Sequence, residues 1–470
     1  MSSVSASSVS SLTTNARLLV VSRYHPDDVS YEGNGRPNLS FEDSRNDGWD
    51  LFNHPRHRRA LILRELAGRS AVSDNAYMNR IAFVRPSPPT NDVAFHLKDS
   101  VYNKVHSPGL LDFLSTGWNR WDAMGEEGQD PSSTVKRNLA EEGDTAVLLS
   151  TKKTLPLIPG NVSLPRNDPY QRPSQNVMGQ VGYYCTDTCT PIFAELLEEL
   201  LWDMETVQMA VQMAVSEENN INEEEEEEEQ KGSSSSKCPR IVYALCTHPG
   251  HHAAKDAYGG YCYVNHSALA ARLMQEGLSQ QQEQNKHSKN NQNPLPLPLP
   301  KVAVLDVDYH CGNGSASIFY DDPSVLVVSI HCHPDWDYPF HSGFEDERGV
   351  GDAIGTTLHL PLLPGTTWDK SYKATLERAM NEIQAFGAQG LVLSLGLDTH
   401  AGDPCAIRRA GFLLQGDDYK EMGALIGKYV VQKQQISVVV VQEGGYKMDK
   451  VPVAAADVLL GLAGMTSTSN

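Results

Sequence analysis

Six short runs of aliphatic residues constrain the fold of this chain more than any other feature. They are Leu18 to Ser22, Ile241 to Cys246, Val302 to Asp308, Val325 to His331, Leu391 to Asp398 and Ile436 to Gln442. Each run is apolar at successive positions, which is the pattern of a strand whose sheet is covered by helices on both faces. Helical stretches separate the later runs and occupy Ser267 to Glu276, Asp369 to Phe386 and Asp417 to Lys433. The alternation predicts an α/β domain with a doubly wound parallel sheet.

The charge of the chain limits the class of partner. The 470 residues are 40% hydrophobic, which is enough for one large core, and the formal net charge is −20. Glu217, Glu218 and the run Glu223 to Glu229 supply part of this charge, and the remainder of the chain is still acidic. An acidic surface repels nucleic-acid phosphates and attracts cationic ligands. We therefore expect no direct nucleic-acid partner.

The cysteines and the first residues bear on the cellular location. Eight cysteines are scattered along the chain, and the one close pair, Cys185 and Cys189, fits neither a disulfide framework nor a cysteine zinc site. Reduced thiols, and the lack of an apolar run that could cross a bilayer, favour a cytoplasmic protein with no membrane partner and leave the nucleus and organelles open. Residues 1–16 are rich in Ser and Thr, which favours a disordered tail, with an organelle targeting segment as the alternative.

Two low-complexity segments interrupt the alternation of strands and helices. The first covers about residues 216–236 and contains the Glu run, and the second covers about residues 279–300 and ends in a Pro-Leu repeat. Neither composition can bury apolar surface. Predicted strands of one sheet lie on both sides of each segment, so we interpret them as insertions. The expected organisation is a single domain over residues 17–464, followed by a short tail at 465–470.

The third apolar run ends in side chains that can bind a metal. Asp306, Asp308 and His310 occupy alternate positions, so an extended strand would point all three to one side. They would lie at the carboxyl end of a parallel strand, where open α/β sheets bind ligands. A capping Asp and a surface His would explain one of these residues but not three in register.

The fifth run ends at Asp398. With Asp308 and His310 it would form a shell of two carboxylates and one imidazole, which leaves a coordination position for water as in catalytic metal sites. Taken alone, Asp398 would be interpreted as the N-cap of a helix. We predict zinc in this shell, and iron(II) is the alternative because it accepts the same ligands.

Two further segments carry residues that could do chemistry. His251 and His252 follow Pro249-Gly250, and they could be either metal ligands or a pair that transfers protons. Tyr446 follows two glycines after the last run, and it could either donate to a developing oxyanion or serve in packing. The residues alone leave these alternatives open.

The order of these motifs resembles that of the histone deacetylase superfamily. The motifs that carry the resemblance are Pro249-Gly250-His251-His252, Gly259-Gly260-Tyr261-Cys262, Asp306-Val307-Asp308-Tyr309-His310, Leu397-Asp398-Thr399 and Gly444-Gly445-Tyr446. Each is weak alone, but the ordered set is specific. The chain is most similar to the acetylpolyamine amidohydrolase and class II deacetylase-like branch, from about Leu18 to Gly464. The resemblance implies a three-layer arginase/deacetylase-type fold with about eight parallel strands between helices.

The resemblance also implies roles for residues at the metal. Asp308, His310 and Asp398 would hold one zinc ion. The catalytic residues would be His251, His252 and Tyr446, with His252 as the base. Asp306 would orient His251, and Asn313 would orient His252.

Further residues would contact the substrate or a second ion. Gly260, Tyr261 and Tyr338 would line the tunnel for the alkyl chain of the substrate. Asp306 and Ser329 would bind a structural potassium ion. Glu126 and Glu127 would contact the amine, in a stretch where the related enzymes dimerise, and a homodimer is expected on the same ground.

Two positions depart from the pattern of the family. Cys311 stands where a second histidine usually follows the metal-binding one, and His248 replaces a usual proline. The position of Cys311 supplies no metal ligand in the family, so we expect activity to persist.

The sequence therefore predicts a zinc-dependent amidohydrolase that removes the acetyl group from a small cationic amine such as an acetylpolyamine. The first alternative is a deacetylase that acts on acetyl-lysine in histones or other proteins. The second is a non-catalytic scaffold or corepressor component that binds partners through its low-complexity segments. The complete set of catalytic residues opposes this last interpretation.

Overall fold

The computed structural model describes residues 17–29, 55–71, 81–89, 96–127, 156–160, 162, 171–216, 240–287, 298–406 and 411–465. The predicted tail at 1–16, the first insertion beyond Ser216 and much of the second insertion lie outside these residues.

A parallel sheet of eight strands occupies the centre of the molecule, in the order β2-β1-β3-β8-β7-β4-β5-β6. The strands are β1 Leu18–Val21, β2 Ile81–Val84, β3 Ile241–Ala244, β4 Val302–Asp306, β5 Val325–Cys332, β6 Thr357–Leu362, β7 Gly390–Leu395 and β8 Ser437–Gln442. Every neighbouring pair is parallel. The carboxyl ends of all strands therefore lie along one edge, and the polar motifs follow the four adjacent central strands β3, β8, β7 and β4.

Alternate residues of each strand enter two separate hydrophobic cores. In β1, Leu18 and Val20 belong to one core, whereas Leu19 and Val21 belong to the other. β4 divides in the same way. Since both faces of the sheet are buried, most positions of each strand are apolar, and this explains the continuous apolar runs.

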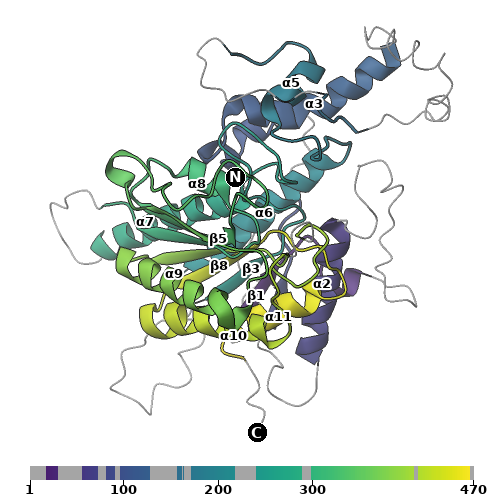
Figure 1. The fold of residues 1–470 in the computed structure, drawn as a ribbon. Coiled ribbons are helices and arrows are strands. Elements are labelled where there is room, and N and C mark those ends of the chain that lie inside the picture. Colours follow the sequence, from purple (N-terminus) through teal and green to yellow (C-terminus); the bar gives the residue numbers. More distant parts are fainter. Residues whose placement is uncertain are drawn as a thin grey trace, which may run out of the picture.

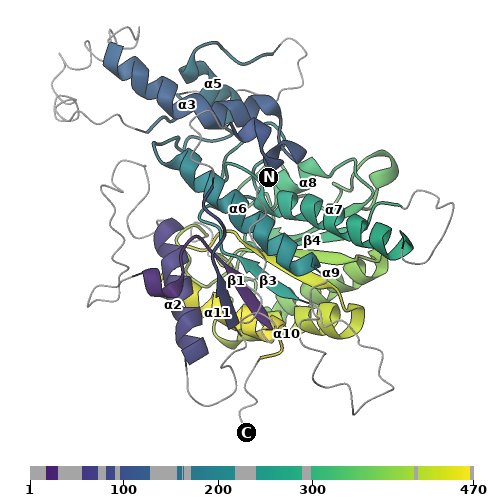
Figure 2. The same cartoon turned by 180° about the vertical axis from the view of Figure 1, so that it is seen from behind.

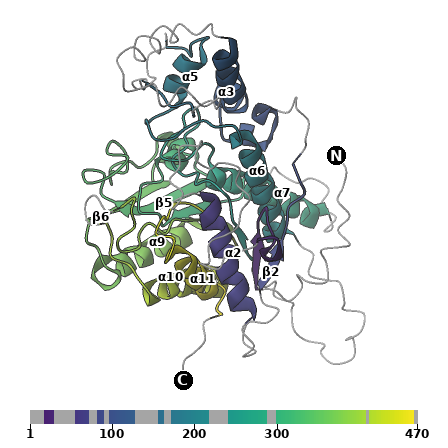
Figure 3. The same cartoon turned by 90° about the vertical axis from the view of Figure 1, so that its right-hand side faces the viewer.

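Helices cover both faces of the sheet. One face packs against α2 Pro55–Ala71, α9 Lys373–Phe386, α10 Asp417–Gly427 and α11 Val451–Leu462 (Figure 1). The opposite face packs against α6 Leu196–Val215, α7 His266–His287 and the short α8 Asn313–Ile318 (Figure 2). The side view separates the two helical layers (Figure 3). This arrangement confirms the predicted three-layer α/β architecture.

Two helices lie beyond one end of the layers, at the top of all three views. They are α3 Pro108–Glu127 and α5 Val177–Tyr184. The Phe113 ring of α3 stacks on Tyr184 of α5, with 5.3 Å between ring centroids. Short 3₁₀ turns occur at Pro26–Asp28, Leu97–Asp99, Val101–Lys104 and Gly351–Ala353. π-helical turns at Trp368–Tyr372 and Lys428–Gln434 precede α9 and follow α10.

The structure contains all six predicted strands and corrects two predicted boundaries. Helix α7 continues to His287, so the first residues of the segment predicted as an insertion from 279 are helical. Met465 is buried in the core that contains α11 and does not belong to a tail. Among the described residues, no helix combines the length and apolar character that a membrane span requires.

Candidate catalytic metal centre

Two adjacent strands deliver the predicted metal ligands. β4 and β7 pair in parallel, with Asp306 opposite Ser394, so the loops that follow them leave the sheet side by side. Their side chains converge: Nδ1 of His310 lies 2.9 Å from Oδ2 of Asp398 and 3.3 Å from Oδ1 of Asp308. One ligand atom from each of the three residues lies within 4.8 Å of the others. Both carboxylates are buried, and we call these three residues the carboxylate–imidazole cluster.

The chain reaches this cluster through turns and not through an extended strand. β4 ends at Asp306, whose Oδ1 accepts the backbone N–H of Asp308 at 3.0 Å. Oδ1 of Asp308 in turn accepts the N–H of His310 at 2.8 Å. The prediction that an extended strand continues to His310 is therefore wrong, and turns after Asp306 place Asp308 and His310. Asp306 instead faces His251, which leaves the carboxylate of Asp398 to complete the cluster.

Two glycines make room for the carboxylates. A side chain at Gly396 would overlap Oδ2 of Asp308. A Cβ atom at Gly444 would lie 2.6 Å from that oxygen and 2.8 Å from Oδ2 of Asp398, closer than real Cβ atoms come. The N–H of Gly444 also donates to Oδ2 of Asp308 at 2.9 Å. The two glycines therefore leave the room that lets two acidic groups lie close together in a buried site.

The electrostatics of the carboxylate–imidazole cluster suit a cation. Burial, followed by the charge of Asp308, raises the pKa of Asp398 to about 7. Burial opposes charge on His310 as well, but the hydrogen bonds and charges of Asp308 and Asp398 outweigh it and raise the pKa of His310 well above its usual value. Two carboxylates and one imidazole are a donor set that zinc accepts. A divalent cation would compensate the buried negative charge, so the residues fit a metal.

The tandem histidines lie against the cluster, and each has a partner. Nδ1 of His251 lies 2.8 Å from Oδ2 of Asp306, and Nδ1 of His252 lies 2.7 Å from Oδ1 of Asn313. Burial favours a neutral His251, but Asp306 and Asp308 outweigh it and raise the pKa of His251 to about 10. Burial, and then the His251 and His310 rings, hold the pKa of His252 well below its usual value.

The two imidazoles have partners of different charge, and this difference affects how easily each ring is protonated. Asp306 offers His251 a negative charge, whereas Asn313 offers His252 only a neutral oxygen. Asn313 therefore fixes the position of His252 without a full charge to stabilise its protonated form.

Sequence reasoning assigned no role to Glu443, although it directly precedes the Gly444-Gly445-Tyr446 motif. Its carboxylate accepts the backbone N–H groups of Gly250 and His251, at 2.6 and 3.1 Å, and the hydroxyl of Ser267 at 2.9 Å. Burial raises the pKa of Glu443 to about 7. Glu443 holds the backbone of the tandem histidines, and no local pattern could show that contact across 192 residues.

Two more residues to which the sequence analysis gave no role contact Tyr446. Asp403 accepts the backbone N–H groups of Tyr446 and Lys447, at 2.7 and 2.9 Å. The buried guanidinium of Arg58 lies 5.4 Å from the centroid of the Tyr446 ring and donates to the carbonyl of Gly445 at 3.3 Å. Burial raises the pKa of Tyr446 well above its usual value, and the charges of Cys405 and Asp398 act in the same direction, so the phenol stays protonated.

The predicted tunnel residues lie next to the catalytic candidates. The ring centroids of Tyr338 and His252 are 4.7 Å apart, and those of Tyr261 and Tyr446 are 5.9 Å apart. Gly260 and Tyr261 have positive φ angles of 58° and 65°. A Cβ atom at Gly260 would press into the His252 ring and lie 3.1 Å from Tyr338. The absence of a side chain at Gly260 therefore leaves these two rings in contact.

Side chains from a distant loop support this unusual backbone. The carboxylate of Asp187 accepts the N–H of Gly260, and Oγ1 of Thr190 accepts the N–H of Tyr261 at 2.9 Å. Thr190 also donates to Asp187 at 2.9 Å.

The remaining predicted site residues are placed as follows. Asp306 and Ser329 are buried neighbours in the register of β4 and β5, where potassium binding was predicted. The Ser329 hydroxyl accepts the N–H of Gly312 at 3.3 Å. Glu126 and Glu127 end helix α3, and their side chains lie outside the described part of the chain. His248, the departure from proline, is buried with Nε2 2.6 Å from Oε2 of Glu199.

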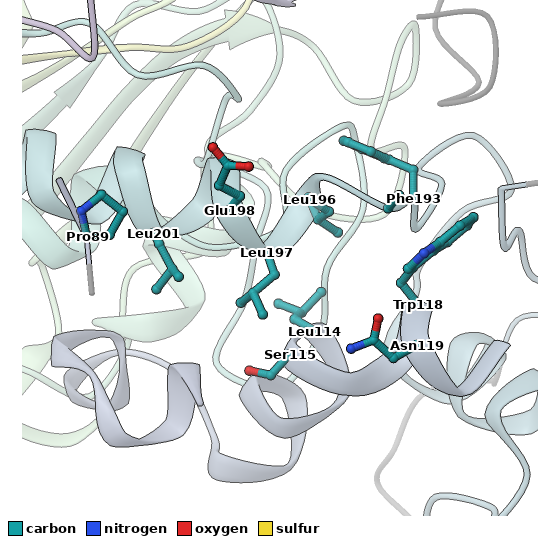
Figure 4. A pocket seen from close by; sticks show the side chains of 11 residues that line it. Pro89, Leu114, Ser115, Trp118, Asn119, Phe193, Leu196, Leu197, Glu198 and Leu201 are labelled. Carbon is teal, nitrogen blue, oxygen red and sulfur yellow. The ribbon is translucent and has the colours of Figure 1, made fainter. Parts of the chain in front are cut away.

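A cavity of about 280 Å³ lies elsewhere, between α3 and α6. Leu197 of α6 faces Leu114 and Ser115 of α3 across it, and Trp118 and Phe193 close one end (Figure 4). None of the predicted catalytic or metal-binding residues lines this cavity. The cavity is therefore separate from the carboxylate–imidazole cluster.

Comparison with known protein families matches residues 90–462 to the histone deacetylase domain. The chain belongs to the histone deacetylase family. Strands β1 and β2 precede the matched residues and still complete the deacetylase sheet, because β1 pairs with both β2 and β3.

Individual members of the deacetylase family can be aligned with most of this chain. Acetylpolyamine amidohydrolase 2 of Pseudomonas aeruginosa is 31% identical over 363 residues, which cover 77% of this chain and 82% of that protein. The acetylpolyamine amidohydrolase of Mycoplana ramosa is 31% identical over 365 residues, with the same coverage. A crystal structure of an acetylpolyamine aminohydrolase from Burkholderia pseudomallei superposes with a TM-score of 0.63 at 24% identity, covering 96% of this chain and 100% of that chain. This last likeness shows the fold.

Proposed function

We propose that this deacetylase uses zinc, held by Asp308, His310 and Asp398, to hydrolyse the acetamide of a small cationic amine such as an acetylpolyamine. The proposal rests on one observation: the neutral histidine His252 lies beside the buried carboxylate–imidazole cluster. The rings of His252 and His310 lie 6.0 Å apart between centroids. When bound, zinc would lower the pKa of a coordinated water and polarise the acetyl carbonyl.

His252 would act as the general base and then as the general acid. Its Nδ1 is engaged by Asn313, so Nε2 is the nitrogen that remains to accept a proton. The lowered pKa of His252 keeps that nitrogen unprotonated at neutral pH. Nε2 would take the proton of the attacking water and return it to the nitrogen of the leaving amine. His251, held by Asp306, lies beside His252 with 4.0 Å between the ring centroids and would help to position that base.

Tyr446 would stabilise the oxyanion. Its raised pKa keeps the proton on the phenol oxygen, which can therefore donate a hydrogen bond. Asp403 and Arg58 hold its backbone and ring, so the donor is oriented before the substrate binds. A preoriented donor in a dry site costs little reorganisation during the reaction.

The proposed substrate class rests on the relatives and on charge. The two curated relatives described above are named as acetylpolyamine amidohydrolases and share about four fifths of their length with this chain. The net charge of −20 favours a cationic amine. We further propose that Glu126 and Glu127 at the end of α3 contact this amine, that the active form is a cytoplasmic homodimer, and that Asp306 and Ser329 bind potassium.

A substrate panel tests the proposal. Zinc-loaded protein is assayed with acetylputrescine, acetylspermidine and an acetyl-lysine peptide, and we expect kcat/KM to be highest for the two polyamines. Glu126→Gln with Glu127→Gln should raise KM for acetylspermidine and leave the neutral model amide N-butylacetamide unaffected. Efficient hydrolysis of the peptide with no hydrolysis of either polyamine would contradict the proposal.

The second candidate is deacetylation of acetyl-lysine in proteins, which the match to a histone deacetylase domain favours. It predicts the opposite order of kcat/KM in the same panel. A scaffold without activity would show equal, background rates for the zinc-loaded wild type and for Tyr446→Phe. Assays of metal-free protein reloaded with either zinc or iron(II) would decide between the two ions.

A further inference from the structure

A second cluster of potential ligands lies beside the catalytic candidates but outside their chemistry. It consists of Cys311, His331 and His359, which we call the thiol–imidazole cluster. Cys311 follows His310 directly, His331 lies in β5, and His359 lies in β6, the neighbouring strand. One ligand atom of each residue lies within 4.8 Å of the others, and all three residues are at most 1% exposed.

The distance between the first two ligand atoms fits a shared ion. Sγ of Cys311 lies 3.6 Å from Nδ1 of His359. Zinc binds sulfur at about 2.3 Å and nitrogen at about 2.0–2.1 Å, and two such ligands at a tetrahedral angle stand about 3.6 Å apart. A weak hydrogen bond between thiol and imidazole would explain this pair, but it would not explain why a second histidine is buried against it.

The opposite nitrogen of His359 has the environment of a metal-bound histidine. Nε2 is buried and has no hydrogen-bond partner among the described residues. It lies 3.6 Å from Oε2 of Glu347. Oε1 of the same carboxylate accepts the N–H groups of Gly343 and Phe344, at 2.6 and 2.8 Å, so Glu347 is held in place. Histidines that bind metals usually donate their other ring N–H to a carboxylate, and a small approach of His359 to Glu347 would form this hydrogen bond.

The third ligand faces a space that a glycine leaves open. A Cβ atom at Gly343 would lie 2.8 Å from Nε2 of His331 and 2.9 Å from Sγ of Cys311. The backbone of Gly343 passes directly beside both ligand atoms. Its φ of 107° is also one that residues with a side chain rarely adopt. Nε2 of His331 now donates to the carbonyl of Gly343 at 2.9 Å, while its Nδ1 lies 2.8 Å from the Ser329 hydroxyl. On binding an ion through Nε2, His331 would give up the first hydrogen bond, and its ring proton would move from Nε2 to Nδ1, where the Ser329 hydroxyl can accept it.

We propose that Cys311, His331 and His359 form a second metal site, distinct from the carboxylate–imidazole cluster, for a thiophilic divalent ion such as Zn²⁺. Binding forms the bond from Sγ to the metal and releases the thiol proton to solvent, so the site gains one thiolate and two neutral imidazoles. Such a ligand set selects a softer ion than magnesium or calcium. The ion would join the loop after β4 to β5 and β6 immediately beside His310.

Cobalt(II) provides a direct test, because a thiolate bound to cobalt absorbs in the near ultraviolet and the carboxylate–imidazole cluster contains no sulfur. Metal-free full-length protein is titrated with Co²⁺. We expect two bound equivalents and a sulfur-to-metal charge-transfer band. Cys311→Ser should remove the band and one equivalent, whereas Asp398→Asn should remove the other equivalent and keep the band. Failure of the catalytic proposal is thereby separated from failure of this one.

Matched cysteine variants control for other thiols. Cys332→Ser changes a buried thiol of β5 outside the cluster, and Cys262→Ser changes the thiol that lies near His251 and Glu443. Both should keep the band. His359→Asn removes the second ligand without touching the neighbour of His310, and should abolish the band as Cys311→Ser does. A wild-type protein that binds cobalt without the band overturns the proposal, and so does a band that survives Cys311→Ser or disappears in Cys262→Ser.

Discussion

The two ligand clusters lie on adjacent residues, His310 and Cys311, yet they offer a metal opposite environments. The carboxylate–imidazole cluster contains two buried carboxylates, and the His310 side chain is 12% exposed. The thiol–imidazole cluster contains no carboxylate ligand, and the His359 side chain is 0% exposed. The first therefore retains some contact with solvent, whereas the second is fully enclosed.

The difference arises from where each cluster lies relative to the sheet. The catalytic candidates follow the carboxyl ends of β4 and β7, where the chain has left the sheet and turns. His331 and His359 lie within β5 and β6, where both faces are covered. The first cluster lies where open α/β sheets bind ligands, whereas the second is enclosed by the chain around it.

The largest expected effect comes from removing one carboxylate of the catalytic cluster. Asp398→Asn should reduce the rate of deacetylation by more than about 100-fold, because it removes a direct ligand where loss of an outer partner already costs about 10–100-fold. Metal content measured on the same sample should fall by one equivalent. Asp321→Asn, an exposed control, should change neither quantity. Full activity in Asp398→Asn would show that the carboxylate–imidazole cluster does not hold the catalytic metal, and would contradict the comparison between the two clusters.

Tyr446→Phe should affect chemistry without affecting either metal. We expect kcat to fall by about 10²–10³-fold, since a preoriented oxyanion donor is lost. Both equivalents of bound metal should remain. Tyr429→Phe removes a phenol that donates to Asn381 on the surface, and it should retain wild-type kcat. An unchanged kcat in Tyr446→Phe would show that another group stabilises the oxyanion.

Asn313→Asp should shift the pH dependence. A carboxylate beside Nδ1 would stabilise protonated His252 and raise its pKa from the depressed value that burial sets. The base works only when unprotonated, so the acidic limb of kcat/KM against pH should move to higher pH. Asn381→Asp is the surface control. A limb that stays in place would show that His252 is not the titrating base.

The smallest expected effect concerns the thiol–imidazole cluster. After the catalytic site is filled, excess zinc should raise the free energy of unfolding by about 2.7 kcal/mol at a hundredfold excess over the dissociation constant. Thermal unfolding followed by circular dichroism measures this as a higher melting temperature. Cys311→Ser should lose the zinc-dependent increase, and Cys332→Ser should keep it. The same increase in both variants would assign the stabilisation to other ligands.

Patterns that depend on neighbouring residues were predictable. Six strands were identified because burial on both faces makes each run continuously apolar, and Asp308, His310 and Asp398 were proposed as metal ligands because they lie at or just after the ends of such runs. β2 and β6 were missed. Only Ile81 of β2 is buried, and β6 contains Thr357, His359 and Pro361. Both are edge strands, where burial is lower and proline is tolerated.

The sequence by itself determined the layers of this deacetylase and the chemical types of its proposed metal ligands, because hydrophobic periodicity and local motifs are properties of adjacent residues. Only the tertiary structure decided which distant groups meet. Glu443 supports the tandem histidines, and Cys311 faces His359, because strand order places their loops side by side. Cys311 therefore changed from a departure without a role into the centre of a proposed site. Contacts of this kind depend on topology and on the space that residues such as Gly343 leave open.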